Sequence, residues 1–258
     1  MSWASSGSAS LNTRPVSKLP PAPAARAPDT KPSFHQIASC KPCPSNGSGA
    51  VTRSNDHLIT SLEALEAHYG AAVPLSLTKE LDHISDHYRA FIEAAPFVAI
   101  ASSGQGGLDC SPRGDPAGFV RVTSPRTIML PDQRGNNRLD TLKNIVGDPR
   151  VALLFLIPGV GETMRINGQA VISTDPGLCA GFIMQGKTPA SVIVVTVDSV
   201  YFQCQKALAR SRLWDPDARV DRATLPTAGE MAEALSAEPF DGAAYDAAYP
   251  ERMKTTIY

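Results

Sequence analysis

The stretch Thr127–Arg138, TIMLPDQRGNNR, joins an apolar strand to a loop that contains two arginines and two asparagines. A helical pattern follows at once, with apolar residues on one face at Leu139, Leu142, Ile145 and Val146. Free backbone N–H groups at the start of that helix would point toward whatever the loop holds, and an anion suits such a position. The pattern therefore predicts a phosphate-binding loop between a strand and a helix.

The side chains of this loop fit the same prediction. Gly135 permits close approach of the backbone, and Arg134 and Arg138 supply forked donors that match phosphate oxygens. Asn136 or Asn137 can cap the helix and donate an amide hydrogen bond. A solvated surface turn has a similar composition, and the stretch is neither a Walker nor a dinucleotide motif. Both interpretations stay open at the level of spacing alone.

Composition separates the chain into three parts. At 258 residues and 43% hydrophobic, the chain can bury one substantial core. Residues 1–57 are rich in Ser, Pro, Ala and Gly, lack apolar periodicity and carry more basic than acidic side chains, so we predict a disordered basic leader. A folded domain is expected over 58–215 and a C-terminal extension over 216–258. The leader has neither an amphipathic helix nor an apolar signal core, which favours a cytoplasmic protein.

Metal, disulfide and membrane sites are not expected. The five cysteines are few and odd in number, and Cys40 and Cys43 form an isolated CxxC pair in the leader. His83 and His87 are spaced to share a helix face, but no third ligand is evident and the neighbouring acids suggest a solvated face. No apolar run reaches the roughly 18 residues that span a bilayer.

Short β-branched runs with Gly, Pro and Asp turns begin at Pro96 and predict an antiparallel sheet or closed barrel. The expected strands are Phe97–Ser102, Leu108–Ser111, Gly118–Val122, Thr127–Leu130, Val151–Ile157, Met164–Ile172 and Val192–Cys204. The expected helices are one that Thr60 caps and Gly70 ends, one over Leu77–Ile92, one over Leu139–Val146, one over Pro176–Gln185, one near Lys206 and a turn at Met231–Leu235. The fold class is therefore mainly β with peripheral helices (α+β).

Two of these strands carry further information. Val151–Ile157, VALLFLI, is apolar on both faces, so it should be covered on both, inside a barrel wall or by a second subunit. Met164–Ile172 alternates instead, with Arg165, Asn167 and Gln169 on one face. That polar face has to meet water or a ligand.

The motifs DCSPRG, LPDQRGNNR, FLIPGVGETMRINGQA and RSRLWDP, in this order over roughly Leu58–Asp215, resemble the pyridoxamine 5′-phosphate oxidase class of flavoproteins. The similarity is to the FMN-dependent branch of unassigned substrate. The resemblance implies an FMN-binding split β-barrel homodimer with FMN at the subunit interface. It implies cofactor-binding roles for Ser111, Arg113, Asn136, Asn137, Arg138, Arg165 and Trp214, to which the loop adds Arg134.

The chain departs from the namesake oxidase at several positions. Its strand reads GFVRV and its loop RGNNR, Thr163 replaces a flavin-contacting glutamine, and Arg212–Asp215 stands where that enzyme holds pyridoxal phosphate. The resemblance therefore predicts an FMN-dependent oxidoreductase that transfers hydride between FMN and a small molecule or NAD(P)H. A non-catalytic flavin storage or sensor protein and a genuine pyridoxamine 5′-phosphate oxidase are the alternatives. Few aromatic residues accompany the basic loop, so nucleic acid is not an expected partner. Glu162 is the acid to consider near substrate, although a solvated hairpin turn is the favoured interpretation of this residue.

Overall fold

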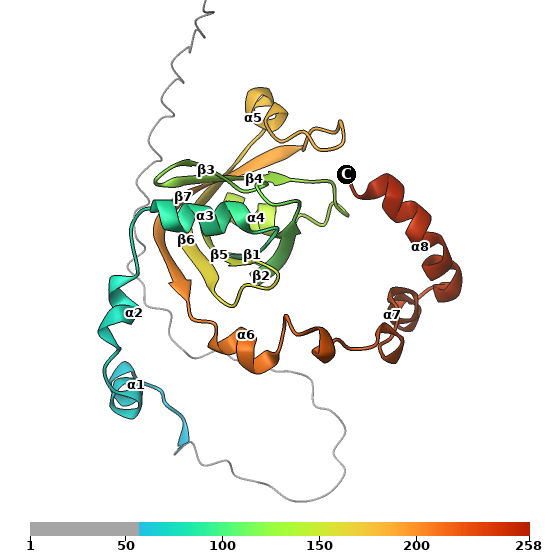
Figure 1. Cartoon of the computed structure of the whole chain (residues 1–258). Helices are drawn as coiled ribbons and strands as arrows, with labels where there is room; N and C mark the ends of the chain where they lie inside the picture. Colours follow the sequence, from blue (N-terminus) through green and yellow to red (C-terminus); the bar gives the residue numbers. More distant parts are fainter. Residues whose placement is uncertain (1–56) are drawn as a thin grey trace, which may run out of the picture. The chain divides into compact units, whose positions relative to one another are not determined.

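A seven-stranded antiparallel sheet forms the centre of the computed structural model, which describes residues 57–258 (Figure 1). Its strands are β1 (Phe97–Gly104), β2 (Gly107–Gly114), β3 (Arg121–Ser124), β4 (Thr127–Asp132), β5 (Arg150–Leu156), β6 (Thr163–Ser173) and β7 (Ser191–Gln203). The strand order is β2-β1-β5-β6-β7-β4-β3, so β5 connects the hairpin of β1 and β2 to the long β6–β7 pair. The predicted leader and its CxxC pair lie outside the described residues, apart from residue 57.

One face of this sheet forms the apolar core, and strand periodicity explains which residues reach it. On β5, Val151, Leu153 and Phe155 are buried, while the side chains between them are only half covered. On β6, Ile166 and Ala170 point inward and Arg165 and Asn167 lie half-exposed on the opposite face. The predicted alternation of β6 is therefore confirmed, and β5 keeps an apolar outer face that this chain covers only in part.

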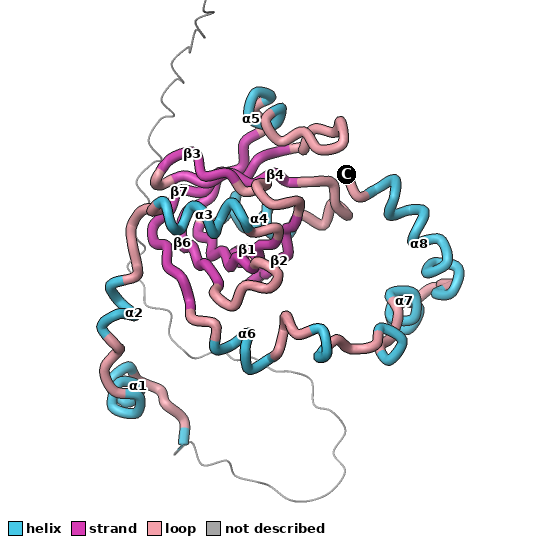
Figure 2. The backbone as a smooth tube through the Cα atoms, viewed as in Figure 1, coloured by secondary structure: helices cyan, strands magenta, loops and turns pink. Residues whose placement is uncertain are grey.

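Eight α-helices accompany the sheet within the described residues (Figure 2). They are α1 (Leu62–Tyr69), α2 (Pro74–Thr78), α3 (Asp86–Ala94), α4 (Asp140–Gly147), α5 (Pro176–Ala180), α6 (Lys206–Ser211), α7 (Ala228–Leu235) and α8 (Gly242–Thr256). Helix α4 packs on β1 through its apolar face, with Ile145 buried. Among residues 57–258, no helix combines the length and the apolar character needed to cross a membrane.

The single helix predicted over Leu77–Ile92 is wrong. Helix α2 ends at Thr78 and α3 starts at Asp86, because Leu81 pairs with Val200 through N–H and C=O bonds of 3.0 and 2.8 Å. The Ser85 hydroxyl then caps α3. His83 therefore precedes the helix that contains His87, and its ring lies 2.8 Å from Asp82 instead.

Other element boundaries also differ from the predictions. Ser61, not Thr60, caps α1, whereas Gly70 ends it at a φ of 75° as expected. Strand β3 begins at Arg121, because Gly118 at a φ of 90° belongs to the preceding turn. Helix α5 ends at Ala180, well before Gln185, which lies with Gly186 in a left-handed turn. Helix α8 was not predicted.

Candidate functional site

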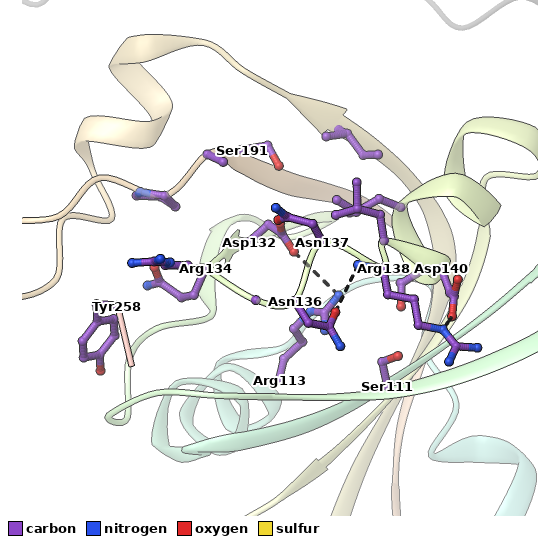
Figure 3. Close-up of a pocket in the computed structure, with 18 of the residues that line it drawn as sticks. Ser111, Arg113, Asp132, Arg134, Asn136, Asn137, Arg138, Asp140, Ser191 and Tyr258 are labelled. Carbon is purple, nitrogen blue, oxygen red and sulfur yellow. Dashed lines mark hydrogen bonds and ion pairs between the residues drawn. The ribbon is translucent and has the colours of Figure 1, made fainter. Parts of the chain in front are cut away.

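A cavity of about 930 Å³ lies where the end of β2, the loop after β4 and the start of α4 meet the segment before β7 (Figure 3). Six of the predicted cofactor-binding residues line it: Ser111, Arg113, Arg134, Asn136, Asn137 and Arg138. They come from two segments separated by β3 and β4. Strands β2 and β4 stand near opposite ends of the strand order, and the 3.6 Å approach of Arg113 on β2 to Asp132 on β4 shows that the fold brings the two segments together. The structure thus gathers the residues that spacing and resemblance selected.

Arg113 is the most deeply placed cation of this cavity. One of its terminal nitrogens lies 3.6 Å from a carboxylate oxygen of Asp132 at the end of β4, and the side chain is 25% exposed. Its Nε is buried and has no hydrogen-bond partner. Burial raises the pKa of Asp132, and the nearby Arg113 charge opposes that rise. A buried donor without a partner is uncommon in folded proteins and is a place where a ligand acceptor would fit.

The loop after β4 has an unusual backbone. Asn137 and Leu139 both adopt left-handed conformations, at φ values of 59° and 61°. The Asn136 side chain accepts a 3.0 Å hydrogen bond from the Arg138 N–H, so it shapes the loop rather than capping the helix. Helix α4 begins after Leu139 without a side-chain cap, so the predicted asparagine cap is wrong. The N–H groups of its first turn consequently remain available to a ligand.

The charges around the cavity do not cancel. Four cationic side chains (Arg113, Arg134, Arg138 and Lys187) and two acidic ones (Asp132 and Asp140) line it, an excess of two positive charges. Arg138 pairs with Asp140, whereas no Asp or Glu side chain of residues 57–258 lies within ion-pair distance of Arg134 or Lys187. The Lys187 ammonium donates a 3.5 Å hydrogen bond to the main-chain oxygen of Tyr258. Such a surface favours a doubly charged anion.

A network of hydroxyl groups forms another wall of the cavity. The Ser111 hydroxyl lies 2.9 and 3.2 Å from the two carboxylate oxygens of Asp109. The Thr141 hydroxyl, in the first turn of α4, lies 2.5 Å from one of the same oxygens. Thr141 is buried, and both hydroxyl residues line the cavity.

The last described residue also reaches this cavity. The Tyr258 hydroxyl donates a 2.6 Å hydrogen bond to Asp115, whose other oxygen accepts a 3.1 Å bond from the Gln133 side chain. The hydrogen bond to Asp115 and partial burial raise the pKa of Tyr258. The contact links the C-terminal extension to Asp115 directly after β2, and Asp115 in turn bonds Gln133 in the loop after β4.

Lys187, Asp132, Thr141 and Tyr258 are cavity residues that the sequence analysis missed. Lys187 follows Gly186 in a tight turn. The glycine is a sequence signal for the turn, but nothing in the local sequence indicates that Lys187 faces a ligand site. Only the pairing of β7 with β4 shows that this turn faces the RGNNR loop.

Two predicted residues lie elsewhere in the chain. Arg165 donates a 3.0 Å hydrogen bond to the Tyr201 hydroxyl and packs over that ring on the outer face of β6 and β7. The Trp214 indole donates a 2.8 Å bond to the Val160 carbonyl and lines a separate cavity of about 280 Å³. Within one chain, Arg165, Trp214 and Glu162 do not line the 930 Å³ cavity.

Comparison with known proteins gives one family and several distant structures. Residues 84–204 match the family model described as pyridoxamine 5′-phosphate oxidase. No curated protein sequence matches at a significant level.

Among solved structures, a HupZ variant of Group A Streptococcus is 15% identical, with a TM-score of 0.39 over 46% of this chain and 99% of its own. A candidate pyridoxamine 5′-phosphate oxidase of Lactobacillus delbrueckii is 16% identical, with a TM-score of 0.37 over 48% and 98%. An FMN-binding protein of Syntrophomonas wolfei is 9% identical, with a TM-score of 0.35 over 44% and 82%.

The matched segment contains all seven strands and the RGNNR loop. It confirms the family resemblance, and with the antiparallel sheet it confirms a mainly β, split-barrel α+β fold. Residues 84–204 therefore belong to the pyridoxamine 5′-phosphate oxidase-like family.

Proposed function

We propose that this chain binds FMN in the 930 Å³ cavity and acts as an FMN-dependent oxidoreductase on a small molecule. The observation that carries the proposal is the excess of two positive charges around the buried, unpartnered Nε of Arg113. A phosphate monoester carries about −1.5 to −2 charge at pH 7 and offers three acceptor oxygens, so it matches both the charge and the free donor. Membership of a family named for a phosphate-binding oxidase supports the same ligand class.

Three cationic side chains and one helix start of this chain would hold the phosphate. Arg134 has no Asp or Glu partner among the described residues, and Asp132 holds Arg113 in place. Lys187 donates a 3.5 Å hydrogen bond to the main-chain oxygen of Tyr258, a contact that it would exchange for the ligand. The uncapped first turn of α4 adds backbone N–H donors. When bound, FMN would supply the hydride chemistry of its isoalloxazine ring, and the protein would supply binding, orientation and exclusion of water.

The experiment begins with the absorbance spectrum of purified full-length protein and a titration with FMN and riboflavin. We expect FMN to bind and riboflavin, which lacks the phosphate, to bind at least about tenfold more weakly, the effect of one or two charge-assisted hydrogen bonds. Protein that is colourless and takes up no FMN would disprove the proposed cofactor.

Anaerobic addition of NADPH or NADH to the yellow protein then addresses catalysis. Bleaching of the flavin, reversed by oxygen or by a metabolite, is the expected result for an oxidoreductase. Flavin that stays oxidised with both nucleotides, and is not reoxidised by any metabolite after chemical reduction, would favour a storage or sensor protein. Turnover of pyridoxamine 5′-phosphate would identify a genuine pyridoxamine 5′-phosphate oxidase.

A further inference from the structure

We infer that Tyr258 is a releasable latch, which holds the C-terminal extension, residues 216–258, at the rim of the cavity and opposes the binding of an anion beside Lys187. The inference rests on the anion-binding part of the proposed function and does not require FMN. Tyr258 bridges two segments: its hydroxyl bonds Asp115 after β2, and its main-chain oxygen accepts a bond from Lys187 before β7. Figure 3 shows the Tyr258 ring at the edge of the residues that line the cavity.

Few interactions attach the extension to the sheet. Helices α7 and α8 pack against each other, and a Cβ added at Gly229 would overlap the Gly242 carbonyl oxygen. In the described part of the chain, the apolar core contains no side chain beyond Phe202. Among the hydrogen bonds and ion pairs of residues 57–258, those of Tyr258 are the only ones that join residues 216–258 to the sheet or its loops. Loss of the Tyr258 contacts would therefore release the extension from the cavity.

The two contacts of Tyr258 differ in strength. The phenol donates a 2.6 Å hydrogen bond to one oxygen of Asp115, and the other oxygen accepts a 3.1 Å bond from Gln133. A hydrogen bond to a carboxylate of this length is a strong one. The Lys187 ammonium lies 3.5 Å from the main-chain oxygen of Tyr258, which is the outer limit for a hydrogen bond. A short movement of Lys187 toward an anion would break this second contact.

The anion and the latch are coupled because both use Lys187. An anion that draws the Lys187 ammonium into the cavity removes one contact of Tyr258, and release of Tyr258 leaves Lys187 free for the anion. Such a coupling acts equally in both directions. Because the shared hydrogen bond is long and exposed, we expect it to change anion affinity by about twofold to fivefold.

The first test measures the binding of inorganic phosphate to the full chain by calorimetry. Tyr258→Phe keeps the ring and removes the hydroxyl that bonds Asp115, so this variant should bind phosphate about twofold to fivefold more tightly than the unmodified chain. Tyr249→Phe on α8, where the tyrosine is 40% exposed, is the matched control and should leave phosphate affinity unchanged. Equal affinity of Tyr258→Phe and the unmodified chain would overturn the inference. Weaker binding by Tyr258→Phe would show that the phenol supports the anion, and would overturn it too.

A double-variant cycle tests whether the effect passes through Lys187. In a Lys187→Gln background the shared cation is absent, so adding Tyr258→Phe should not raise phosphate affinity further. A gain of the same size with and without Lys187 would overturn the proposed coupling.

NMR gives a structural readout that does not depend on affinity. The chain has six tyrosines, so protein labelled only at tyrosine gives few ring signals, and the Tyr258 signal is the one that Tyr258→Phe removes. Inorganic phosphate should move this signal part of the way toward its position in the unfolded chain, and Lys187→Gln should do the same without phosphate. A Tyr258 signal that responds to neither would overturn the latch. Circular dichroism establishes that each variant is folded.

FMN titration of the same proteins separates this inference from the proposed function. FMN uptake with equal phosphate affinity in the unmodified chain and Tyr258→Phe would support the proposed cofactor and overturn the latch. Tighter phosphate binding by Tyr258→Phe without FMN uptake would support the latch and disprove the cofactor. If neither chain binds phosphate, the latch is overturned and FMN uptake alone decides the cofactor.

Discussion

At the scale of single residues, the Arg113 side chain forms an ion pair and also has one N–H donor without a hydrogen-bond partner. Asp132 lies 3.6 Å from its guanidinium, while its Nε is buried and unpartnered. Arg113→Ala should therefore lower FMN affinity at least about tenfold, because a charge-assisted hydrogen bond to the phosphate is lost. FMN titration by fluorescence quenching measures this, and Arg210→Ala on α6 is an exposed control. Equal FMN occupancy in the two variants would contradict the assignment of the cavity.

Lys187 allows a separate test of the charge around the cavity. It approaches from the segment before β7, where no Asp or Glu side chain of the described residues lies within ion-pair distance and its ammonium donates a 3.5 Å hydrogen bond to the main-chain oxygen of Tyr258. Lys187→Gln should weaken FMN binding several-fold without a change in riboflavin binding, since only the phosphate interacts with this charge. The effect should diminish at high salt, because the side chain is exposed. Lys206→Gln on α6 serves as the control. If Lys187→Gln weakened riboflavin binding as much as FMN binding, Lys187 would not act through the phosphate charge.

At the scale of elements, the β6–β7 pair depends on a glycine. The register shifts between Asn167 and Gly168, and a Cβ at Gly168 would overlap the Thr196 carbonyl oxygen. Gly168→Ala should lower the free energy of unfolding by about 1–3 kcal/mol, the usual cost of forcing an extra carbon into a packed site. Urea denaturation measures it against Gly106→Ala, where an added Cβ meets open space. Equal urea midpoints for the two variants would show that strands β6 and β7 accommodate the added carbon without loss of stability.

The turn from α4 to β5 gives a pH-dependent prediction. Hydrogen bonds from the side chain and N–H of Arg150 lower the pKa of Asp148 to about 2. An unfolded aspartate has a pKa near 3.9, so the pair stabilises the fold above about pH 4, and this stabilisation is lost as the pH falls toward 2. The urea midpoint of the unmodified chain should exceed that of Asp148→Asn at pH 7 and approach it at low pH. Asp198→Asn provides the comparison, and a difference that does not depend on pH would contradict this account.

Local patterns predicted the elements well where one physical signal dominated. Alternation identified β6, and the apolar run VALLFLI identified β5. The helix over Leu77–Ile92 failed because the pairing of Leu81 with distant Val200 overrides helical spacing, and no local pattern reports such a contact. Lys187 and Tyr258 could not be predicted for the same reason. The composition of the RGNNR loop identifies the loop itself, but its neighbours in the cavity come from distant segments that only the folded chain places beside it.

At the scale of the whole molecule, the outer face of β1 and β5 points to a second copy of the chain. Phe97 is 37% exposed, and Ala99, Ala152, Leu154 and Leu156 are only half covered. An apolar strip of this kind is usually covered in solution, and we propose a homodimer that buries it. Arg165 lies next to Leu154 in the register, so the same interface would bring Arg165 toward the partner.

Leu154→Asp tests this proposal, because a charge on the strip would have to be desolvated in the dimer. Light scattering at micromolar concentration should show a dimer for the unmodified chain and a monomer for the variant. Val171→Asp, an exposed apolar position near the end of β6, is the control and should stay dimeric. A monomeric unmodified chain would disprove the dimer.

The hydrogen bond between Tyr258 and Asp115 has a practical consequence for biochemistry on this protein. Because that phenol forms part of the cavity wall, a peptide fused after it would emerge beside the cavity. A purification handle at this end would compete with the proposed ligand for the cavity and would lower the apparent affinity. Handles placed ahead of residue 57, or removed by protease before assay, avoid that artefact.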